Sequence, residues 1–252
     1  MELRRNIYKK LLAWKKENTG RVLELQGARQ VGKTYILKKF GKENFSKMVY
    51  INMAETTGKH FLQCVSIAME WEPGKPMEET PIRKALELYD ETFKDNKDTV
   101  VIIDEIQESA EIYNQIRTLA REFQAYVIVT GSYLGRTIEP DFFLPAGDMD
   151  HMVMEFLDVF DERELYEKID LYGKGRTEDY KKLMEYYEIY QKIGGYPAVV
   201  ACYAEYRDLN KCMGLISDLI NVFSDESKRY FEDIIDINMF QKLFNAIALL
   251  MM

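Results

Sequence analysis

Cysteine and histidine are scarce in this sequence, and their scarcity excludes two classes of protein. The three cysteines, Cys64, Cys202 and Cys212, are isolated, form no C-x-x-C pair and are odd in number. A disulfide-stapled scaffold and a zinc-binding module are therefore excluded, and we expect reduced thiols that serve in packing. The two histidines, His60 and His151, lack a second ligand at helical spacing, so they indicate no metal site either.

A long apolar run is also missing. The longest one, residues 246–252, is far shorter than the roughly 20 residues that span a bilayer. The N-terminus, MELRRNIYKK, lacks the apolar stretch of a secretory signal. Because 47% of the 252 residues are hydrophobic and 30% are charged, the chain can bury a sizeable core, which excludes general disorder. We expect a soluble, cytoplasmic protein with one large domain or a core and a smaller appendage.

Positive charge is in the minority, and its distribution is uneven. A net charge of −8 argues against a protein that coats nucleic acid by bulk electrostatics. Residues 1–48 nevertheless hold 13 of the 34 Lys+Arg and 4 of the 42 Asp+Glu, so this segment carries +9 and the remainder −17. The basic segment is either a solvated helix face or a part of the chain that serves an anionic ligand.

Hydrophobic patterns predict alternating strands and helices in the first part of the chain. Strands are expected at 22–25, 48–53, 99–103, 126–129 and 151–156, and helices at 6–16, 35–40, 57–69, 81–93 and 110–123. This alternation favours an α/β fold, with a parallel sheet between two layers of helices. Helices alone are expected afterwards, at 162–169, 178–193, 197–206, 209–223 and 236–252. We therefore predict a core at 1–157 and a helical domain at 158–252.

One octapeptide carries the strongest chemical signal. Residues 27–34 match G-x-x-x-x-G-K-[ST] in full, between a predicted strand and a predicted helix. Such a loop wraps a phosphate with backbone N–H groups at the N-terminus of a helix, whereas a glycine turn before an ordinary helix is the alternative. Lys33 is expected to reach the β- and γ-phosphates and Thr34 to bind Mg²⁺. The predicted phosphate-binding residues are Gly27, Ala28, Arg29, Gln30, Val31, Gly32, Lys33, Thr34 and Tyr35.

Two acidic residues end the strand predicted at 99–103. Asp104 and Glu105 follow four apolar residues, at the carboxyl end where open α/β sheets bind ligands. We assign Asp104 to Mg²⁺ and Glu105 to the attacking water. Alone this pattern is weak, because acids often follow strands, but a complete phosphate loop lies about 70 residues upstream.

The strand predicted at 126–129 leads into hydroxyl groups. Thr130 and Ser132 are candidates for sensing the γ-phosphate or holding the water, and a plain strand followed by a turn is the alternative. The residues after them do not form G-x-S-x-G, so an esterase elbow is not supported.

Four segments of the sequence together resemble those of a known family. The matching segments are Gly27–Thr34, Ile103-Asp104-Glu105-Ile106-Gln107, Thr130-Gly131-Ser132 and Gly194-Gly195-Tyr196-Pro197. Together they resemble the prokaryotic AAA+ ATP-binding proteins, in which a P-loop ATPase core and a small winged-helix region precede an uncharacterised C-terminal domain. The resemblance implies a three-layer αβα sheet of order 5-1-4-3-2, adenine near Ile7 and Tyr8, and a place for Gln107 in the site.

The sequence departs from this family at two places. Relatives commonly carry Ala-Gly-Arg after the third motif, but here Asp148 follows Ala146 and Gly147, which leaves Arg136 as the nearest substitute for an arginine finger. The chain also stops within an apolar helical pattern at 246–252. We expect either a fragment, which is the favoured interpretation, or a helix capped by another chain.

These observations predict a Mg²⁺-dependent, ATP-binding protein of AAA+ type. It is expected to hydrolyse ATP slowly and to change the angle between the sheet core and the helical domain. Two alternatives stay open: a nucleotide-gated switch or interaction module, and the ATPase part of a DNA-processing or mobile-element system. The missing arginine favours the switch, whereas the intact pair of Asp104 and Glu105 favours turnover. A protein partner or a second copy of the chain is compatible with each.

Overall fold

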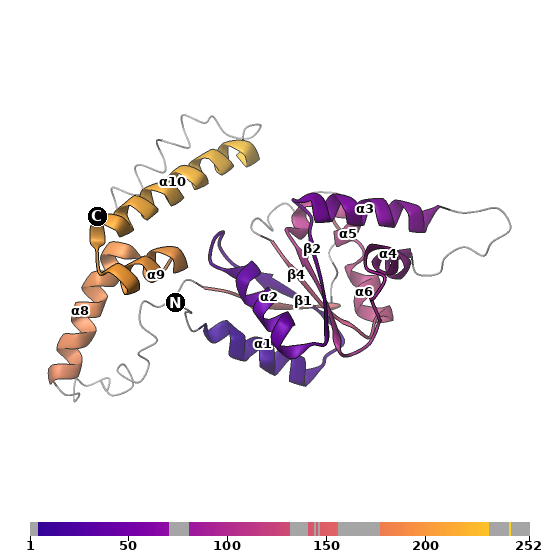
Figure 1. Cartoon of the computed structure of the whole chain (residues 1–252), viewed down its shortest axis with the longest axis horizontal. Helices are drawn as coiled ribbons and strands as arrows, with labels where there is room; N and C mark the ends of the chain where they lie inside the picture. The colour runs from indigo at the N-terminus through magenta and orange to yellow at the C-terminus, as the bar shows by residue number, and fades with distance from the viewer. Residues whose placement is uncertain are drawn as a thin grey trace. The chain divides into compact units, whose positions relative to one another are not determined.

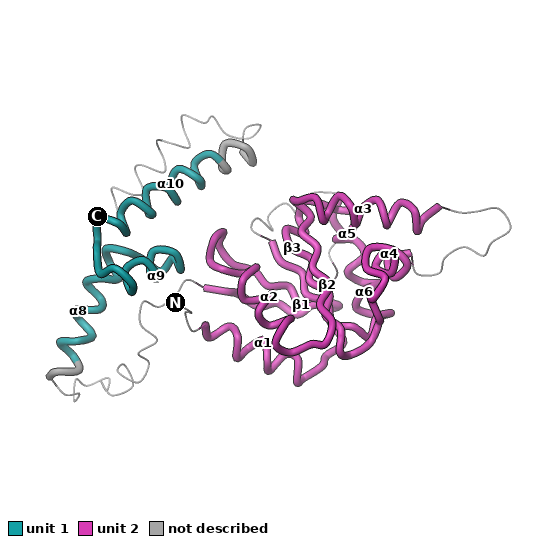
Figure 2. Tube along the Cα trace, viewed as in Figure 1, with its two compact units in different colours: residues 1–3, 157–252 teal, residues 4–156 magenta. Residues whose placement is uncertain are grey.

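The computed structural model describes residues 5–70, 81–131, 141–143, 145, 147–155, 177–231 and 242. Figure 2 shows that the chain divides into two compact units. One comprises residues 4–156, and the other comprises residues 157–252 together with residues 1–3. Each unit is described by itself below.

The first unit is built on a five-stranded sheet in which every strand pairing is parallel. The strands are β1 (Val22–Gln26), β2 (Lys47–Asn52), β3 (Thr99–Asp104), β4 (Tyr126–Thr130) and β5 (Met149–Val153). Their order in space is β2-β3-β4-β1-β5, which confirms the expected order 5-1-4-3-2. Because β1 lies between β4 and β5, the loop that follows it opens at the carboxyl edge of the sheet between these two strands.

Two helices cover one face of this sheet, α1 (Asn6–Glu17) and α2 (Lys33–Asn44). Side chains alternate along a strand, so every second residue of β1, β3 and β4 points to this face. The resulting core is formed by Leu23, Leu25, Val100, Ile102 and Ile128 of the strands, packed against Ile7, Leu11 and Trp14 of α1 and Ile36, Leu37 and Phe40 of α2. The same alternation directs Asp104, two residues after Ile102, towards α2.

Four helices and a short 3-10 turn cover the opposite face (Figure 1). They are α3 (Thr56–Met69), α4 (Pro81–Tyr89), η1 (Ile106–Glu108), α5 (Ala110–Tyr113) and α6 (Ile116–Glu122). Their apolar side chains, among them Phe61, Leu86 and Ile112, pack on Val101, Ile103 and Val129 of the strands. The predicted three-layer αβα fold is confirmed.

The structure corrects several predicted boundaries of the first unit, among them that of α2, which spans 33–44 instead of 35–40. The helix expected at 110–123 is two helices, α5 and α6, because the Asn114 side chain donates to the Asp141 carbonyl (2.9 Å) and accepts from the Phe143 amide (2.8 Å) at the break. Helix α4 ends at Tyr89, since the Asp90 carboxylate accepts from the Thr92 amide (3.0 Å) and forms a turn. Strand β5 occupies 149–153 instead of 151–156, in register with β1.

The described part of the second unit contains helices α8 (Thr177–Ile193), α9 (Pro197–Tyr206) and α10 (Leu209–Phe231). A small core joins them through Ile193, Val199, Cys212 and Leu219. Helix α10 is longer than the expected 209–223, because neither proline nor glycine interrupts residues 224–231. The helices expected at 162–169 and 236–252 lie outside the described residues, apart from residue 242. Among the helices that are described, none is long and apolar enough to cross a membrane.

Candidate functional site

The predicted phosphate loop joins the carboxyl end of β1 to the first turn of α2. Three of its residues have a positive φ: Gly27 (151°), Gln30 (59°) and Gly32 (96°). Gly32 caps α2, whose first residue is Lys33. The partly positive end of the helix therefore opens directly onto the loop, as an anion-binding site requires.

Gly27 is also required by packing. A Cβ atom at this position would lie 2.5 Å from the Met154 carbonyl oxygen, at the end of β5. Because the Met154 amide donates to the Gln26 carbonyl (2.8 Å), the two segments are held at this short separation. A side chain at position 27 would push β5 away from the loop.

The Lys33 side chain is buried and turns back over the loop. Its ammonium donates to the carbonyl oxygens of Gly27 (2.7 Å) and Ala28 (3.0 Å). Burial lowers the pKa of Lys33 below its usual value, and the carboxylates of Glu105 and Asp104 oppose that shift. The carbonyl oxygens of Gly27 and Ala28 therefore hold the ammonium against the first residues of the loop.

Asp104, at the end of β3, lies at the centre of the polar contacts and is 1% exposed. Its Oδ2 atom accepts hydrogen bonds from the hydroxyls of Thr34 (2.6 Å) and Tyr50 (2.8 Å). Its Oδ1 atom accepts from the Glu105 amide (3.0 Å). Burial, followed by the charge and the hydrogen bond of Asp104, raises the pKa of Tyr50 well above its usual value.

This arrangement fits a magnesium ion. Hydroxyl and carboxylate oxygens are hard ligands, and Mg²⁺ in phosphate sites is held by one or two carboxylates plus phosphate oxygens. Thr34 and Asp104 supply the protein part of such a set beside the phosphate loop. In the described part of the chain no group of three or more His, Cys, Asp or Glu side chains could hold a metal ion by itself.

Glu105 has a left-handed backbone (φ 52°), which turns its side chain out of the strand direction. Its Oε2 atom accepts a hydrogen bond from the Gln107 side-chain amide (2.5 Å). Gln107 is 1% exposed, and its Oε1 atom is buried without a partner among the described residues. Gln107 thus contacts the predicted catalytic carboxylate, as the family resemblance implies.

The other predicted residues lie in different surroundings. Thr130 is buried, and its hydroxyl donates to the Leu25 carbonyl (2.7 Å), so its proton is already engaged. Tyr35 is 58% exposed on α2. Ser132 and Arg136 lie outside the described residues, so their roles stay predictions. The loop between Gly27 and Gly32 contains the remaining predicted residues, Ala28, Arg29, Gln30 and Val31.

The residues expected near adenine lie on α1. Ile7 is buried in the core beside α2, and Tyr8 packs edge-on against Phe40 while its hydroxyl accepts from the Asn44 amide (3.0 Å). Asp148, at the position where the family resemblance implies arginine, accepts two hydrogen bonds from Arg121 (3.0 and 3.2 Å). An aspartate is therefore accommodated by an ion pair with α6.

Sequence reasoning missed two side chains of the site, Arg5 and Tyr50. Tyr50 reaches Asp104 because β2 and β3 run in parallel register, with Tyr50 opposite Ile102. Tyrosine in a strand usually signals packing, so no local pattern distinguishes it. Arg5 donates to the Val31 carbonyl (2.9 Å) from a position 26 residues away in the sequence. The basic charge of the first segment was the available signal for it.

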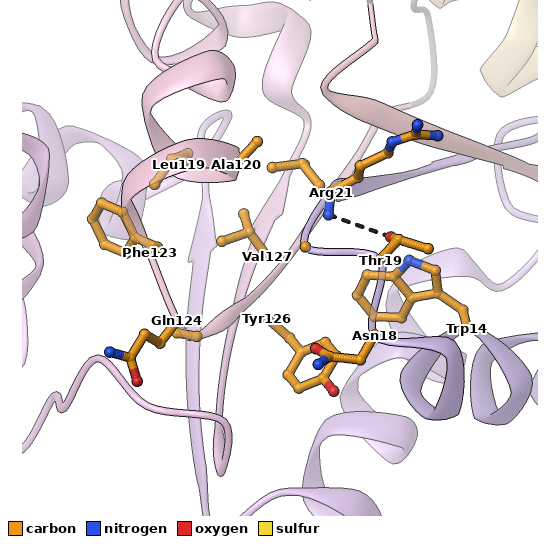
Figure 3. Close-up of a pocket in the computed structure, with 13 residues that line it drawn as sticks. Trp14, Asn18, Thr19, Arg21, Leu119, Ala120, Phe123, Gln124, Tyr126 and Val127 are labelled. Atoms are coloured by element: carbon orange, nitrogen blue, oxygen red, sulfur yellow. Dashed lines mark hydrogen bonds between the residues drawn. The ribbon is translucent and has the colours of Figure 1, made fainter.

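A pocket lies at the opposite, amino end of the strands, where β1 and β4 begin (Figure 3). Trp14, Arg21, Phe123 and Tyr126 are among its lining residues, and the Arg21 amide donates to the Thr19 hydroxyl (3.3 Å) beside it. Its volume is about 30 Å³. A cavity of that volume has room for water molecules.

A family model described as "AAA domain" matches residues 19–161, more than half of the chain. Among solved structures, the chain is similar to the Walker-type ATPase of Pyrococcus abyssi (17% identity, TM-score 0.50, 91% of this chain and 77% of that one). PCH-2 of C. elegans is more distant, with 15% identity, a TM-score of 0.43 and coverage of 83% of this chain and 65% of that one. ORC2 of Aeropyrum pernix is also more distant, with 17% identity, a TM-score of 0.38 and coverage of 66% of this chain and 50% of that one. The search of curated proteins finds no match. At such identities, structural likeness shows the fold alone.

Proposed function

Since this chain belongs to the AAA domain family of ATP-binding proteins, we propose that it is a Mg²⁺-dependent ATPase. We further propose that hydrolysis changes the angle between its two units. One observation carries the proposal: the Thr34 hydroxyl at the start of α2 and the Asp104 carboxylate at the end of β3 lie 2.6 Å apart beside the phosphate loop. Residues 70 positions apart thus form one oxygen-rich site next to a buried lysine.

Each residue of the site has a defined task in this reaction. The loop amides and Lys33 bind the phosphates and neutralise their charge. Thr34 and Asp104 would hold Mg²⁺, which when bound would draw charge away from the phosphate oxygens. Glu105 orients and polarises the attacking water. Catalysis then consists of positioning and charge neutralisation by groups that are already assembled.

A slow nucleotide-gated switch is the second candidate, and one contact favours it. The Gln107 amide occupies Oε2 of Glu105 at 2.5 Å, so one of the two oxygens that would act on water is engaged. A phosphate release rate far below 1 s⁻¹, against the about 1–100 s⁻¹ of typical phosphoryl-transfer enzymes, identifies the switch. The rate should be measured at several protein concentrations, because assembly of copies can raise it.

Lys33→Ala tests the binding function. The change removes the buried ammonium that meets the phosphates, and we expect calorimetry to detect no ATP binding. Lys42→Ala is the matched control, since Lys42 is an exposed residue in the last turn of the same helix. Unchanged ATP affinity in Lys33→Ala would overturn the phosphate-loop assignment.

A further inference from the structure

Arg5 connects two segments that are far apart in the sequence. It precedes α1, and its guanidinium donates through one nitrogen to the Val31 carbonyl (2.9 Å) and through another to the Glu155 carbonyl (2.8 Å). Val31 belongs to the phosphate loop, whereas Glu155 lies just after β5 and is the last described residue of the first unit. A planar fork of donors is suited to such a bridge.

The end of β5 packs on the same side of the loop. The Met154 amide donates to the Gln26 carbonyl (2.8 Å), immediately before the loop begins. A Cβ atom at Gly32 would lie 3.7 Å from the Met154 methyl and 3.8 Å from the Arg5 guanidinium. Arg5 and Met154 therefore support the loop where its glycines leave no side chain to do so.

The bond to Val31 has a geometric consequence for the loop. The carbonyl of Val31 and the amide N–H of Gly32 belong to one planar trans peptide, so they point in opposite directions. Fixing the carbonyl towards Arg5 fixes the Gly32 N–H away from it. In an anion-binding loop the N–H groups must converge on the ligand, and this bond sets one of them.

We propose that Arg5 is a positioning residue for the phosphate loop, and that it couples ATP binding in the loop to the backbone at residues 154–155, where the chain leaves the first unit. The proposal rests on the proposed function, because it requires ATP in the loop. Because Arg5 binds both segments, the conformation of the loop and that of the backbone after β5 depend on each other. Ordering one segment orders the other.

The experiment compares Arg5→Ala with Arg21→Ala. Arg21 is a matched control because it is also basic, lies near the N-terminus and contacts β5, through Asp150 (3.2 Å), without touching the loop. ATP affinity is measured by calorimetry, and amide hydrogen exchange at residues 154–155 is measured with and without saturating ATP. The exchange rate at saturating ATP reports the coupling, because a loss of affinity alone does not change that rate once the site is full.

In the parental protein and in Arg21→Ala we expect ATP to slow exchange at residues 154–155. In Arg5→Ala we expect ATP affinity to fall about tenfold, the equivalent of one hydrogen bond from a charged group. The slowing of exchange should then be absent even at saturation. Arg5→Lys keeps the charge without the fork and should also lose the coupling.

Three results decide against the inference. If Arg5→Ala binds ATP as the parental protein does and keeps its protection at 154–155, the bridge has no role. If Arg5→Lys restores both properties fully, charge alone suffices and the two-carbonyl geometry is wrong. A parental protein that binds no ATP overturns the proposed function and this inference with it, whereas the first two results leave the proposed function intact.

Discussion

Two buried charged side chains, Lys33 of α2 and Asp104 of β3, lie at the carboxyl ends of the strands, whereas aromatic rings pack at the amino ends. There the Trp14 ring meets Tyr126 edge-on, with 5.4 Å between centroids, and the Trp14 indole donates to Asp150 (3.3 Å). The charged side chains of Arg21 and Asp150 at this end are paired with each other and stay partly exposed.

The two ends of the sheet thus differ in the kind of side chain that they bury. Burying a charge costs free energy of desolvation, and at the carboxyl end the hydrogen bonds of Lys33 and Asp104 oppose that cost. The amino end buries aromatic area at no such cost. Substitutions at the two ends should therefore separate activity from stability.

Glu105→Gln should show the largest effect, at the carboxyl end. The amide cannot accept a proton from the attacking water, so we expect phosphate release to fall by about 10²- to 10⁴-fold. ATP affinity and thermal unfolding should stay near the parental values. Glu111→Gln, at an exposed position on α5, is the control. Hydrolysis at the parental rate would remove Glu105 from the catalytic role.

Trp14→Ala tests the amino end, where we expect a loss of stability without a loss of ATP affinity. Trp14 is 4% exposed, so its removal leaves a cavity and should lower the free energy of unfolding by about 3–5 kcal/mol. Measured in urea, the loss should far exceed that of Leu12→Ala on the exposed side of α1. ATP affinity of the folded variant should not change, and a parallel loss of affinity would mean that the two ends are not separable.

Tyr50→Phe should weaken Mg²⁺ binding without a comparable effect on the free energy of unfolding. It removes one of the two hydroxyls that orient Oδ2 of Asp104, and such outer-sphere partners contribute about 10- to 100-fold to metal affinity. The readout is the Mg²⁺ concentration required for tight nucleotide binding. Tyr126→Phe, whose hydroxyl donates to the Lys15 carbonyl at the amino end, is the control. Equal Mg²⁺ requirements in the two variants would contradict the role of Tyr50.

Asp148→Asn should have the smallest effect, and it should depend on pH. Hydrogen bonds from Arg121 lower the pKa of Asp148, so the folded state favours the ionised form. Its contribution to stability is therefore present above the unfolded pKa of about 3.9 and is lost as pH falls through the lower folded value.

Urea unfolding measures this dependence. The parental protein should exceed Asp148→Asn in stability at pH 7, and the difference should shrink towards about pH 3. Asp98→Asn, at an exposed site, should show less pH dependence. A difference that is constant with pH would mean that the ion pair with Arg121 does not contribute.

The sequence predicted much of this site because its signals are local. The loop from Gly27 to Thr34 and the acids after β3 are contiguous patterns whose chemistry requires those residue types, and the structure places Thr34 against Asp104. The break at Asn114 was missed because it depends on residues 141–143, which lie far along the chain. Helical periodicity within residues 110–123 contains no trace of that contact.

Spacing within short segments was enough to predict the phosphate loop, the two acids and the alternation of strands and helices, and the structure confirms the alternation. The sheet order was implied only by the family resemblance, and the structure confirmed it. The contact of Tyr50 with Asp104 and the bridge from Arg5 to the loop and Glu155 are visible in the folded chain alone. These contacts depend on strand register and on packing between segments up to 150 residues apart, which no local pattern records.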